Sequence, residues 1–361
     1  MNVLSALMLI FAVLGALDRI FGSRLGLGRE FERGFMLLGN TALTMIGMIV
    51  LAPLFARWLE PVSQWIHTVL KLDPSIIPAS LLANDMGGAS MSVEMNRHEG
   101  IGMFNGLVVS SMMGCTVSYT VPYSMGCVRQ EKHRELFTGL LCGIVTLPIG
   151  CFFGGLMLGL PLGLLLWDLV PLVLFSVLVA CGLAFASSLT VKLFSWLGLL
   201  IRGIITVGLV LGMLETMAGI VLIPGLAKMS EGTAICMNAV MVLAGAFPLM
   251  YVVSKLLARP LDKLGGLLGI GADGAMGFLS SSVTNTASFA LIDKMDKKGV
   301  VLNSAFAVSG SFVFGAHLAF TMAMDASYIP AMMVGKLISG VCAVALAIFV
   351  YKRIYDKGEK A

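Results

Sequence analysis

The sequence predicts an all-α integral membrane protein with about nine full transmembrane helices and two re-entrant hairpins, arranged as two repeats of inverted topology. Three observations predict this fold. Of the 361 residues, 58% are hydrophobic and 12% are charged, whereas about a quarter of the residues of a soluble domain are charged. The apolar residues form runs long enough to cross a bilayer, which takes about 20 residues. Two segments of mixed polarity also occur in similar surroundings in the two halves of the chain.

Nine apolar runs are long enough to be transmembrane helices. They cover residues 2–21, 34–59, 100–128, 136–160, 162–186, 193–222, 232–258, 299–324 and 328–351. The first run has no Lys or Arg before it and so lacks the basic region of a cleaved signal peptide, and we expect it to be retained as a span. Residues 60–72 contain Pro61 and Trp65 and are expected to lie along the membrane interface, where tryptophan is enriched.

The first segment of mixed polarity covers residues 75–94. It is too polar, and too interrupted by Pro78 and the glycine pair that begins at Gly87, to be a plain spanning helix, and it is too apolar for a loop in water. Irregular backbone at membrane depth is tolerated only where protein or a water-filled cavity satisfies its polar groups. We therefore expect a re-entrant hairpin with Asn84 and Asp85 at its tip.

The second segment, residues 265–292, resembles the first. Aligning Ala89 with Ala287 without gaps also places Asn105 on Asn303. The order of elements repeats as well, with two spans, a polar link that contains proline, a hairpin, a charged exit and two more spans. The expected units are repeat 1 at residues 1–160, a linking span at 161–192, repeat 2 at 193–351 and a charged cytoplasmic tail at 352–361.

The span count fixes the relative orientation of the repeats. One span between two units of four spans starts the second unit on the opposite face, so the repeats are expected to be inverted, as in many secondary transporters. On this topology, loops on the face of the C-terminus carry 18 Lys and Arg residues and loops on the other face carry 4, with Arg202 and Lys336 inside spans. The positive-inside rule then places the N-terminus outside and the C-terminus in the cytoplasm, with hairpins that enter from opposite sides.

Charged groups inside the hydrocarbon are costly and are by default candidate functional residues. Asp85 stands beside Asn84, and its counterpart in the second repeat is Val283. One carboxylate among hydroxyls and amides suits a small, singly positive, hydrogen-bonding solute. The candidate hydroxyl and amide groups are Ser90, Ser280, Ser281, Ser282, Thr284, Asn285 and Thr286. Two other roles stay open, since Asp85 can cap a helix and the Ser/Thr run can satisfy its own backbone as a turn.

Other polar residues in or near the spans are weaker candidates. Asn105 and Asn303 occupy equivalent positions and either bind the solute or hold helices together. Glu215 either carries a proton or contacts the solute, or else it neutralises a basic residue. Asp273 is either a site or coupling residue or, because glycines flank it, part of a turn. His317 is expected to hydrogen-bond between helices.

Several function classes receive no support from the sequence. It contains no HExxH, GxSxG or Walker A motif, so it predicts neither such an enzyme nor an ATP-driven pump. The seven cysteines lie mostly in apolar runs without CxxC spacing, which predicts neither a disulfide framework nor a metal site. No cofactor is expected. Nucleic-acid binding is not expected either, because the basic residues lie in short loops at one membrane face.

Three strings of residues are distinctive. They are Leu-Ala-Asn-Asp-Met-Gly-Gly at 82–88, Met-Asn-Arg-His-Glu-Gly at 95–100 and Ala-Ser-Phe-Ala-Leu-Ile-Asp-Lys-Met-Asp at 287–296. With the length of the chain and its start, they resemble the EutH-type ethanolamine transport proteins of bacterial ethanolamine-utilisation gene clusters, over essentially the whole chain. The resemblance implies uptake of ethanolamine across the bacterial inner membrane, to feed a cobalamin-dependent ammonia-lyase. It brings no established binding residues with it.

The resemblance and the residues agree on the substrate, because ethanolamine at neutral pH is a cation with one hydroxyl group. We expect Asp85 to pair with the ammonium while Asn84, Asn285 and the Ser or Thr hydroxyls bind the hydroxyl group. The expected activity is facilitated or proton-coupled import by alternating access, in which the hairpins move against a scaffold. The expected partners are ethanolamine and the lipid bilayer, with a homodimer only by analogy. A channel-like pore for small amines, or a membrane sensor or scaffold subunit that binds ethanolamine without transport, remains the alternative.

Overall fold

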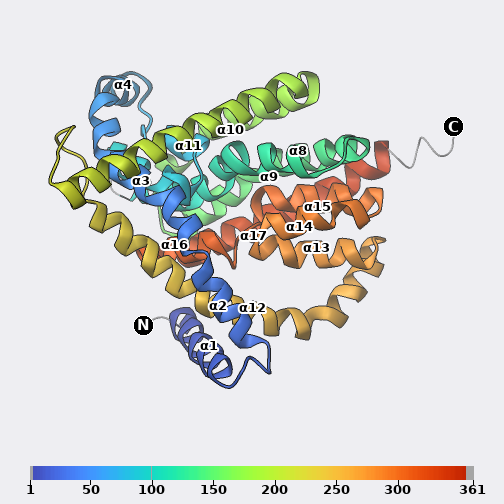
Figure 1. Ribbon diagram of the computed structural model, residues 1–361. Helices are drawn as coiled ribbons and strands as arrows, with labels where there is room; N and C mark the ends of the chain where they lie inside the picture. Colours follow the sequence, from blue (N-terminus) through green and yellow to red (C-terminus); the bar gives the residue numbers. More distant parts are fainter. Residues whose placement is uncertain (1–2, 99, 355–361) are drawn as a thin grey trace.

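The computed structural model describes residues 3–98 and 100–354, and within these residues it is helical with no β-strand. Figure 1 shows long helices that run side by side along the molecule. Seven helical stretches among the described residues are long and apolar enough to cross a membrane, namely Leu27–Trp58, Ile101–Cys127, Gln130–Met157, Leu162–Phe185, Ser187–Ala218, Met229–Leu257 and Ala316–Ile354. The prediction of an all-α, multi-pass membrane protein is confirmed at this level. Residues 1–2 of the expected first span and 355–361 of the expected tail lie outside the described residues.

The N-terminal helices form the edge of the molecule. They are α1 (Val3–Ile20), α2 (Leu27–Met36), α3 (Leu38–Trp58), α4 (Glu60–Trp65) and η1 (Ile66–Leu70). Helices α1 and α2 contact each other and α12, and lie together beneath the main group of helices in Figure 1. The carboxylate of Asp18 accepts the backbone N–H groups of Leu25 and Gly28 at 2.9 and 2.8 Å, which satisfies two otherwise free donors where α2 begins.

The next segment is a first helix pair, followed by a long helical rod. The pair consists of α5 (Ile76–Leu81) and α6 (Gly88–Met95), with the short η2 (Asn84–Met86) at its tip. The rod consists of α7 (Ile101–Phe104), η3 (Asn105–Gly114), η4 (Thr116–Thr120) and α8 (Val121–Cys127). These four are continuous, and η3 and η4 are π-helical. Gly114 lets this rod approach the end of α5, because a Cβ there would lie 2.6 Å from the Ala79 carbonyl oxygen.

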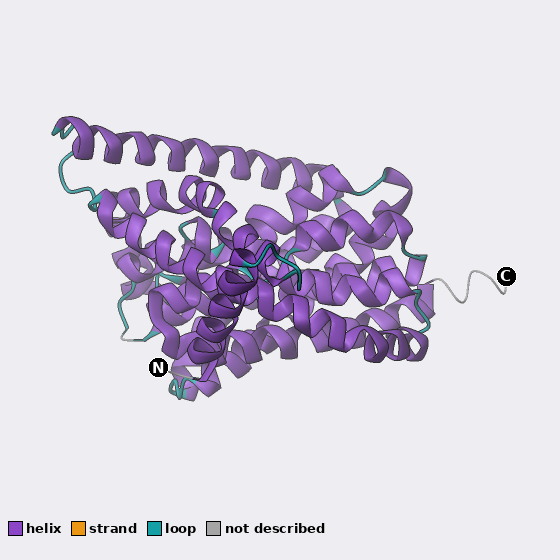
Figure 2. Cartoon of the chain, turned by 60° about the horizontal axis from the view of Figure 1, so that its bottom comes forward, coloured by secondary structure: helices purple, strands orange, loops and turns teal. Residues whose placement is uncertain are grey.

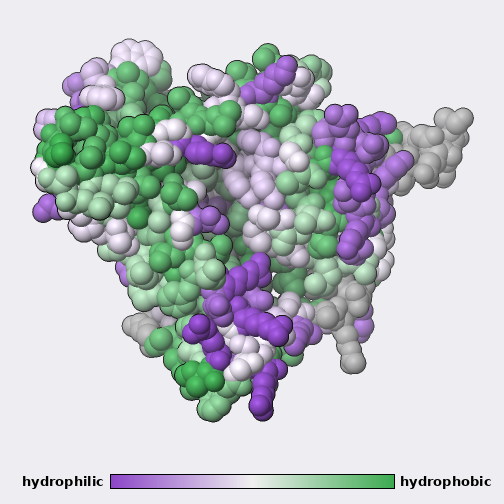
Figure 3. All heavy atoms as spheres, viewed as in Figure 1, coloured by the Kyte–Doolittle hydropathy of each residue, from purple (hydrophilic) through white to green (hydrophobic). Residues whose placement is uncertain are grey.

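Four long helices follow the rod in the chain. They are α9 (His133–Met157), α10 (Leu162–Phe185), α11 (Ser187–Ala218) and α12 (Met229–Leu268). Helix α9 packs between α15 and α17, and the side of α10 and α11 away from the core exposes large apolar residues such as Leu178 and Trp196. An apolar flank of this kind suits a lipid environment. Figure 3 shows hydrophilic side chains gathered at the end of the molecule next to the C-terminus.

The second half contains a second helix pair, formed by α13 (Ala272–Val283) and α14 (Asn285–Leu291). The pair is followed by η6 (Ile292–Lys294), α15 (Lys297–Ser309), α16 (Ala316–Asp325), η7 (Ala326–Tyr328) and α17 (Ile329–Ile354). As α5 does with α6, helix α13 contacts α14 directly. Figure 2 shows that loops lie mainly at the ends of long helices and at a few places where helices are interrupted within the bundle.

The expected span at 299–324 differs from the structure, where helix α15 ends at Ser309 and α16 begins only at Ala316. In the intervening turn Phe312 adopts a left-handed backbone conformation, with φ of +57°. The backbone N–H groups of Phe312 and Phe314 donate to the carbonyl oxygens of Ser281 and Ser282, both at 2.9 Å. These bonds satisfy the free carbonyl groups at the end of α13, so the break in one helix completes the end of another.

Candidate binding site

A cavity of about 170 Å³ lies where the tip of the first helix pair meets α3, the π-helical rod and the break before α16. We name it the Asp85 cavity. Its lining residues are Thr44, Ala83, Asp85, Met86, Cys115, Tyr119, Phe312 and His317. This lining combines one carboxylate with two aromatic rings, an imidazole and two hydroxyl groups.

The backbone at the tip explains how Asp85 is presented to the cavity. Helix α5 ends at Leu81, the next residue Leu82 is extended, and Gly87 begins the return with φ of +101°, in the left-handed region that glycine favours. The rod satisfies the opened backbone, because Ser110 Oγ donates to the Leu82 carbonyl at 2.5 Å and Ala83 N–H donates to Ser118 Oγ at 3.1 Å. The turn is thus held by hydroxyl groups of the rod.

The Asp85 carboxylate is not used as a helix cap. Neither η2 nor α6 has a side-chain cap hydrogen bond, and among residues 3–98 and 100–354 no other residue donates a hydrogen bond to this carboxylate. Its neighbour Asn84 is fully buried, accepts the Asp85 N–H on Oδ1 at 3.0 Å, and has no partner for Nδ2 within the described part of the chain. The tip therefore offers a free acceptor, and a free amide donor directly beside it in sequence.

The polar run of the second helix pair is used mainly for internal bonds. Asn285 accepts the Ser281 hydroxyl at 2.7 Å, and its Nδ2 donates to the Ala307 carbonyl at 3.1 Å and to Thr120 Oγ1 at 3.2 Å. Ser282 Oγ donates to the Leu279 carbonyl at 2.7 Å. These contacts tie α13 and α14 to the rod and to α15, which favours the structural role for this part of the run.

A second cavity, of about 220 Å³, lies between α2, α12 and the second helix pair. We name it the α2–α12 cavity; its lining includes Glu30, Arg33, Tyr251, Val283, Thr284 and Ala287. Tyr119, which lines the Asp85 cavity, shares a hydrogen bond of 3.0 Å with Thr286 Oγ1. Thr286 is not itself in the α2–α12 lining, but it lies in the chain between Thr284 and Ala287, which are, so this bond connects the lining of one cavity to the chain segment that lines the other.

The remaining predicted residues lie outside the Asp85 lining. Asn105 Nδ2 donates to Ser75 Oγ at 2.9 Å and to Asp168 Oδ1 at 3.2 Å, and Asn303 Nδ2 donates to the Gly274 and Gly299 carbonyls at 2.9 Å. Each asparagine fastens the first arm of a helix pair to the helix that follows the pair, which is the packing alternative.

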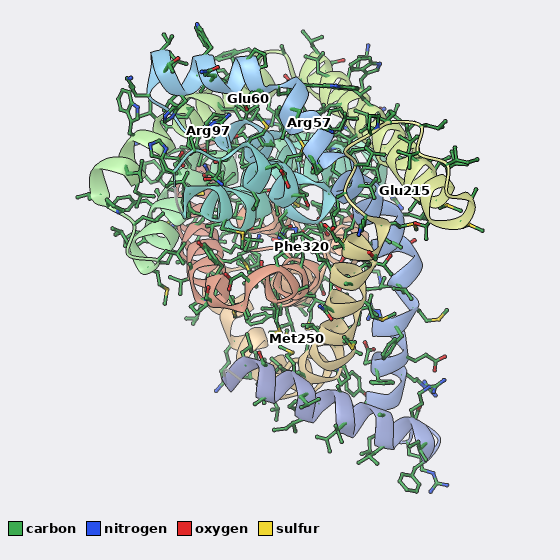
Figure 4. All side chains as sticks on the ribbon, turned by 90° about the vertical axis from the view of Figure 1, so that its left-hand side faces the viewer. Arg57, Glu60, Arg97, Glu215, Met250 and Phe320 are labelled. Carbon is green, nitrogen blue, oxygen red and sulfur yellow. The ribbon has the colours of Figure 1, made fainter. Side chains whose placement is uncertain are left out.

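Three further candidates are also separate from this cavity. Ser90 is on α6 and Asp273 is in the first turn of α13, both partly buried. Glu215 is in the last turn of α11. Figure 4 shows Glu215 at the outer edge of the molecule, away from Phe320 on the central helix α16.

Most of the wall opposite Asp85 was not predicted from the sequence. The rings of Tyr119 and Phe312 lie 5.8 Å apart, and those of Phe312 and His317 lie 4.8 Å apart. Behind His317, the buried Lys336 donates from Nζ to the Ser111 carbonyl at 2.7 Å. A lysine inside an apolar helix was a usable signal, whereas nothing in the sequence distinguishes Tyr119 from other aromatic residues of the spans.

The fold and the cavity define a multi-pass helical membrane protein whose helices are interrupted around an internal polar site. The chain belongs to the family described as "Ethanolamine utilisation protein, EutH", which it matches over residues 1–350. The resemblance inferred from the sequence is thereby confirmed.

Named relatives cover nearly the whole chain. The chain is 40% identical to the "Probable ethanolamine permease EutH" of Listeria monocytogenes, across 98% of this chain and 95% of the relative. It is 33% identical to the protein of the same name from Salmonella typhimurium, across 96% and 94% of the two chains. It is 36% identical to "Uncharacterized protein YxeR" of Bacillus subtilis, across 93% and 91%. No solved structure matches the chain.

Proposed function

We propose that this protein is a secondary transporter or facilitator that imports protonated ethanolamine across the bacterial inner membrane by alternating access. The names of the relatives support transport and the substrate. The observation that carries the proposal for this chain is the carboxylate of Asp85, which faces an internal cavity without a hydrogen-bond donor from any other described residue. A carboxylate inside a membrane protein that receives no hydrogen bond and no direct ion pair is costly unless a cation joins it.

The cavity wall matches the two ends of ethanolamine. In the proposed complex the ammonium group pairs with Asp85 and lies against the faces of Tyr119 and Phe312, since aromatic rings attract cations. The hydroxyl group of the substrate bonds to Thr44, which lines the cavity, or, after a movement of the tip, to the unpaired Nδ2 of Asn84, which is buried outside the lining. Asn285, Asn105 and Asn303 contribute by holding the helix pairs in place.

The proposed transport route uses both cavities. The Asp85 cavity contacts the first helix pair, and the α2–α12 cavity contacts the second. In the described conformation the Tyr119–Thr286 hydrogen bond connects the Asp85 lining to the segment that carries Thr284 and Ala287 of the α2–α12 lining. Opening this contact while the first pair closes over Asp85 would transfer the substrate from one cavity to the other, with α1, α2 and α12 as the scaffold.

The proposed topology is that of two inverted repeats, residues 1–160 and 193–351, with re-entrant hairpins that approach the midplane from opposite sides. Two short helix pairs, each followed by an asparagine that binds its first arm, support the repeat. The excess of Lys and Arg in loops on the side of the C-terminus supports a cytoplasmic C-terminus and an external N-terminus. Under this orientation the α2–α12 cavity lies on the cytoplasmic side.

The decisive experiment is uptake of labelled ethanolamine into proteoliposomes, with the wild type, Asp85→Asn and protein-free vesicles in parallel. A carrier gives saturable uptake and counterflow, and Asp85→Asn loses both at ethanolamine concentrations that just saturate the wild type. Non-saturable flux would instead support a pore, and binding without flux would support a sensor or scaffold subunit. Full uptake at unchanged affinity by Asp85→Asn would overturn the proposed site.

A further inference from the structure

Lys336 is the most deeply buried charged side chain in the neighbourhood of the Asp85 cavity. It lies on α17, is 0% exposed, and forms no ion pair within the described part of the chain. Its Nζ donates to the Ser111 carbonyl at 2.7 Å and lies 3.2 Å from His317 Nδ1. A buried ammonium held only by neutral groups needs a nearby negative charge.

The groups around Lys336 leave one source of that charge. The titratable side chains that act on it are the thiols of Cys115 on the rod and Cys151 on α9, the imidazole of His317 on α16, and the carboxylate of Asp85 on η2. Of these, only Asp85 is a carboxylate. Lys336 and Asp85 are not in direct contact, since no N–O distance of 4.0 Å or less joins them within the described residues.

His317 connects the ammonium to the cavity. It lines the Asp85 cavity and also faces Lys336 through Nδ1. When the ammonium donates to Nδ1, the imidazole is neutral and carries its proton on Nε2. A proton can then leave in two linked steps: Lys336 gives one to Nδ1, and Nε2 gives its own to a cavity water. The products are a neutral amine on Lys336, a neutral imidazole of the other tautomer, and a hydronium ion in the cavity.

Loss of this proton would keep the net charge of the site constant when the substrate binds. In the empty site the ammonium of Lys336 and the carboxylate of Asp85 sum to zero. A bound ethanolammonium raises the sum to +1, and two cations, one in the cavity and one behind His317, then repel each other in surroundings of low dielectric constant. Loss of the Lys336 proton returns the sum to zero, so the empty and the loaded site can cross the membrane with the same charge.

We infer that Lys336, through His317, is the proton-exchange group of this transporter, so that each ethanolammonium bound at Asp85 expels one proton and transport is an electroneutral exchange. The inference rests on the proposed function and adds a second transported ion to it. Release of the substrate on the far side lets Lys336 recover a proton there by the reverse path, which resets both residues.

The first test counts protons in the binding step of the purified protein. Isothermal titration with ethanolamine at pH 7, in two buffers of different ionisation enthalpy, gives the number of protons released. The wild type is expected to release about one proton per ethanolamine, and Lys336→Gln to bind ethanolamine without release. Lys228→Gln, which changes an exposed lysine on the loop before α12, is the matched control and should release a proton as the wild type does.

The outcomes separate the two proposals. Binding by the wild type without proton release overturns the exchange and leaves the proposed function standing, and so does proton release that persists in Lys336→Gln. Absence of any ethanolamine binding by the wild type overturns both. The wild-type proton count needs no variant, so the inference stays testable even if Lys336→Gln fails to fold.

The second test measures the charge that moves. With equal pH on both sides, an inside-negative potassium diffusion potential should leave wild-type uptake in proteoliposomes unchanged. The same potential should drive accumulation in Lys336→Gln, since that variant carries a cation with no counter-ion. Tenfold accumulation corresponds to about 60 mV. Uptake by the wild type that follows the potential would overturn the inference.

Discussion

The hydroxyl groups of Tyr119 and Thr286 lie 3.0 Å apart and join the π-helical rod to the second helix pair. The same tyrosine lines the Asp85 cavity, and Thr284 and Ala287, between which Thr286 lies in the chain, line the α2–α12 cavity. One hydrogen bond therefore holds together the two segments that line the cavities of the proposed transport cycle. Its strength is expected to influence how readily the route opens.

Tyr119→Phe keeps the ring and removes this bond. A hydrogen bond contributes about 1 kcal/mol, so we expect ethanolamine counterflow to accelerate about fivefold with little change in binding affinity. Thr286→Val removes the same bond from the other side and should give the same acceleration. Because both changes delete one interaction, the double variant should be no faster than either single variant. Unchanged counterflow in both single variants would show that this contact does not limit opening.

Asp85→Asn keeps the size of the side chain and removes its charge. A hydrogen bond to a charged group contributes about 2 kcal/mol, so we expect ethanolamine binding to weaken about 30-fold, measured by titration of the purified protein. Asp273→Asn changes a carboxylate in the first turn of α13, outside the Asp85 lining, and should leave affinity unchanged. Weaker binding by Asp273→Asn together with wild-type affinity of Asp85→Asn would place the site at the second helix pair.

The long helices were predictable because their apolar runs are continuous. The run at 162–186 became α10, Leu162–Phe185, and the run at 136–160 became α9, His133–Met157. The break after Ser309 was not predictable in this way. Residues 310–315 are as apolar as the helices around them, and their backbone leaves the helix to donate to Ser281 and Ser282, which are distant in sequence.

The site was predictable where a single residue carried the signal. Asp85 is a carboxylate in an apolar segment, and the structure places it in a cavity. Tyr119, Phe312 and His317 reach the same cavity from three separate elements. Their assembly depends on how the rod and the α15–α16 break pack together, which no local pattern of residues encodes. The polar run around Asn285 was conspicuous in sequence, yet its amide is occupied by bonds to the rod and to α15.

Asn303→Ala separates the packing role of this residue from a binding role. Nδ2 holds the Gly274 carbonyl of α13 against α15, and the residue is 1% exposed. Loss of a buried amide that bonds two carbonyl groups is expected to lower the free energy of unfolding by about 2 kcal/mol, seen as a lower thermal midpoint, with ethanolamine affinity unchanged. Asn238→Ala, at an exposed position of α12, is the control. Weakened binding at full stability would instead assign Asn303 to the site.

Gly114→Ala tests whether the close contact between the rod and α5 sets the position of Asp85. The added Cβ would lie 2.6 Å from the Ala79 carbonyl oxygen and would also collide with the Leu82 carbonyl, and both atoms belong to backbone that cannot rotate away. Overpacking of this kind costs about 1–3 kcal/mol, and it would push the tip of the first pair away from the rod. We expect a lower thermal midpoint together with weaker ethanolamine binding. Gly126→Ala is the matched control on the same rod, because a Cβ there meets nothing within 4 Å. If Gly114→Ala destabilised the protein yet bound ethanolamine with wild-type affinity, the position of Asp85 would not depend on this contact.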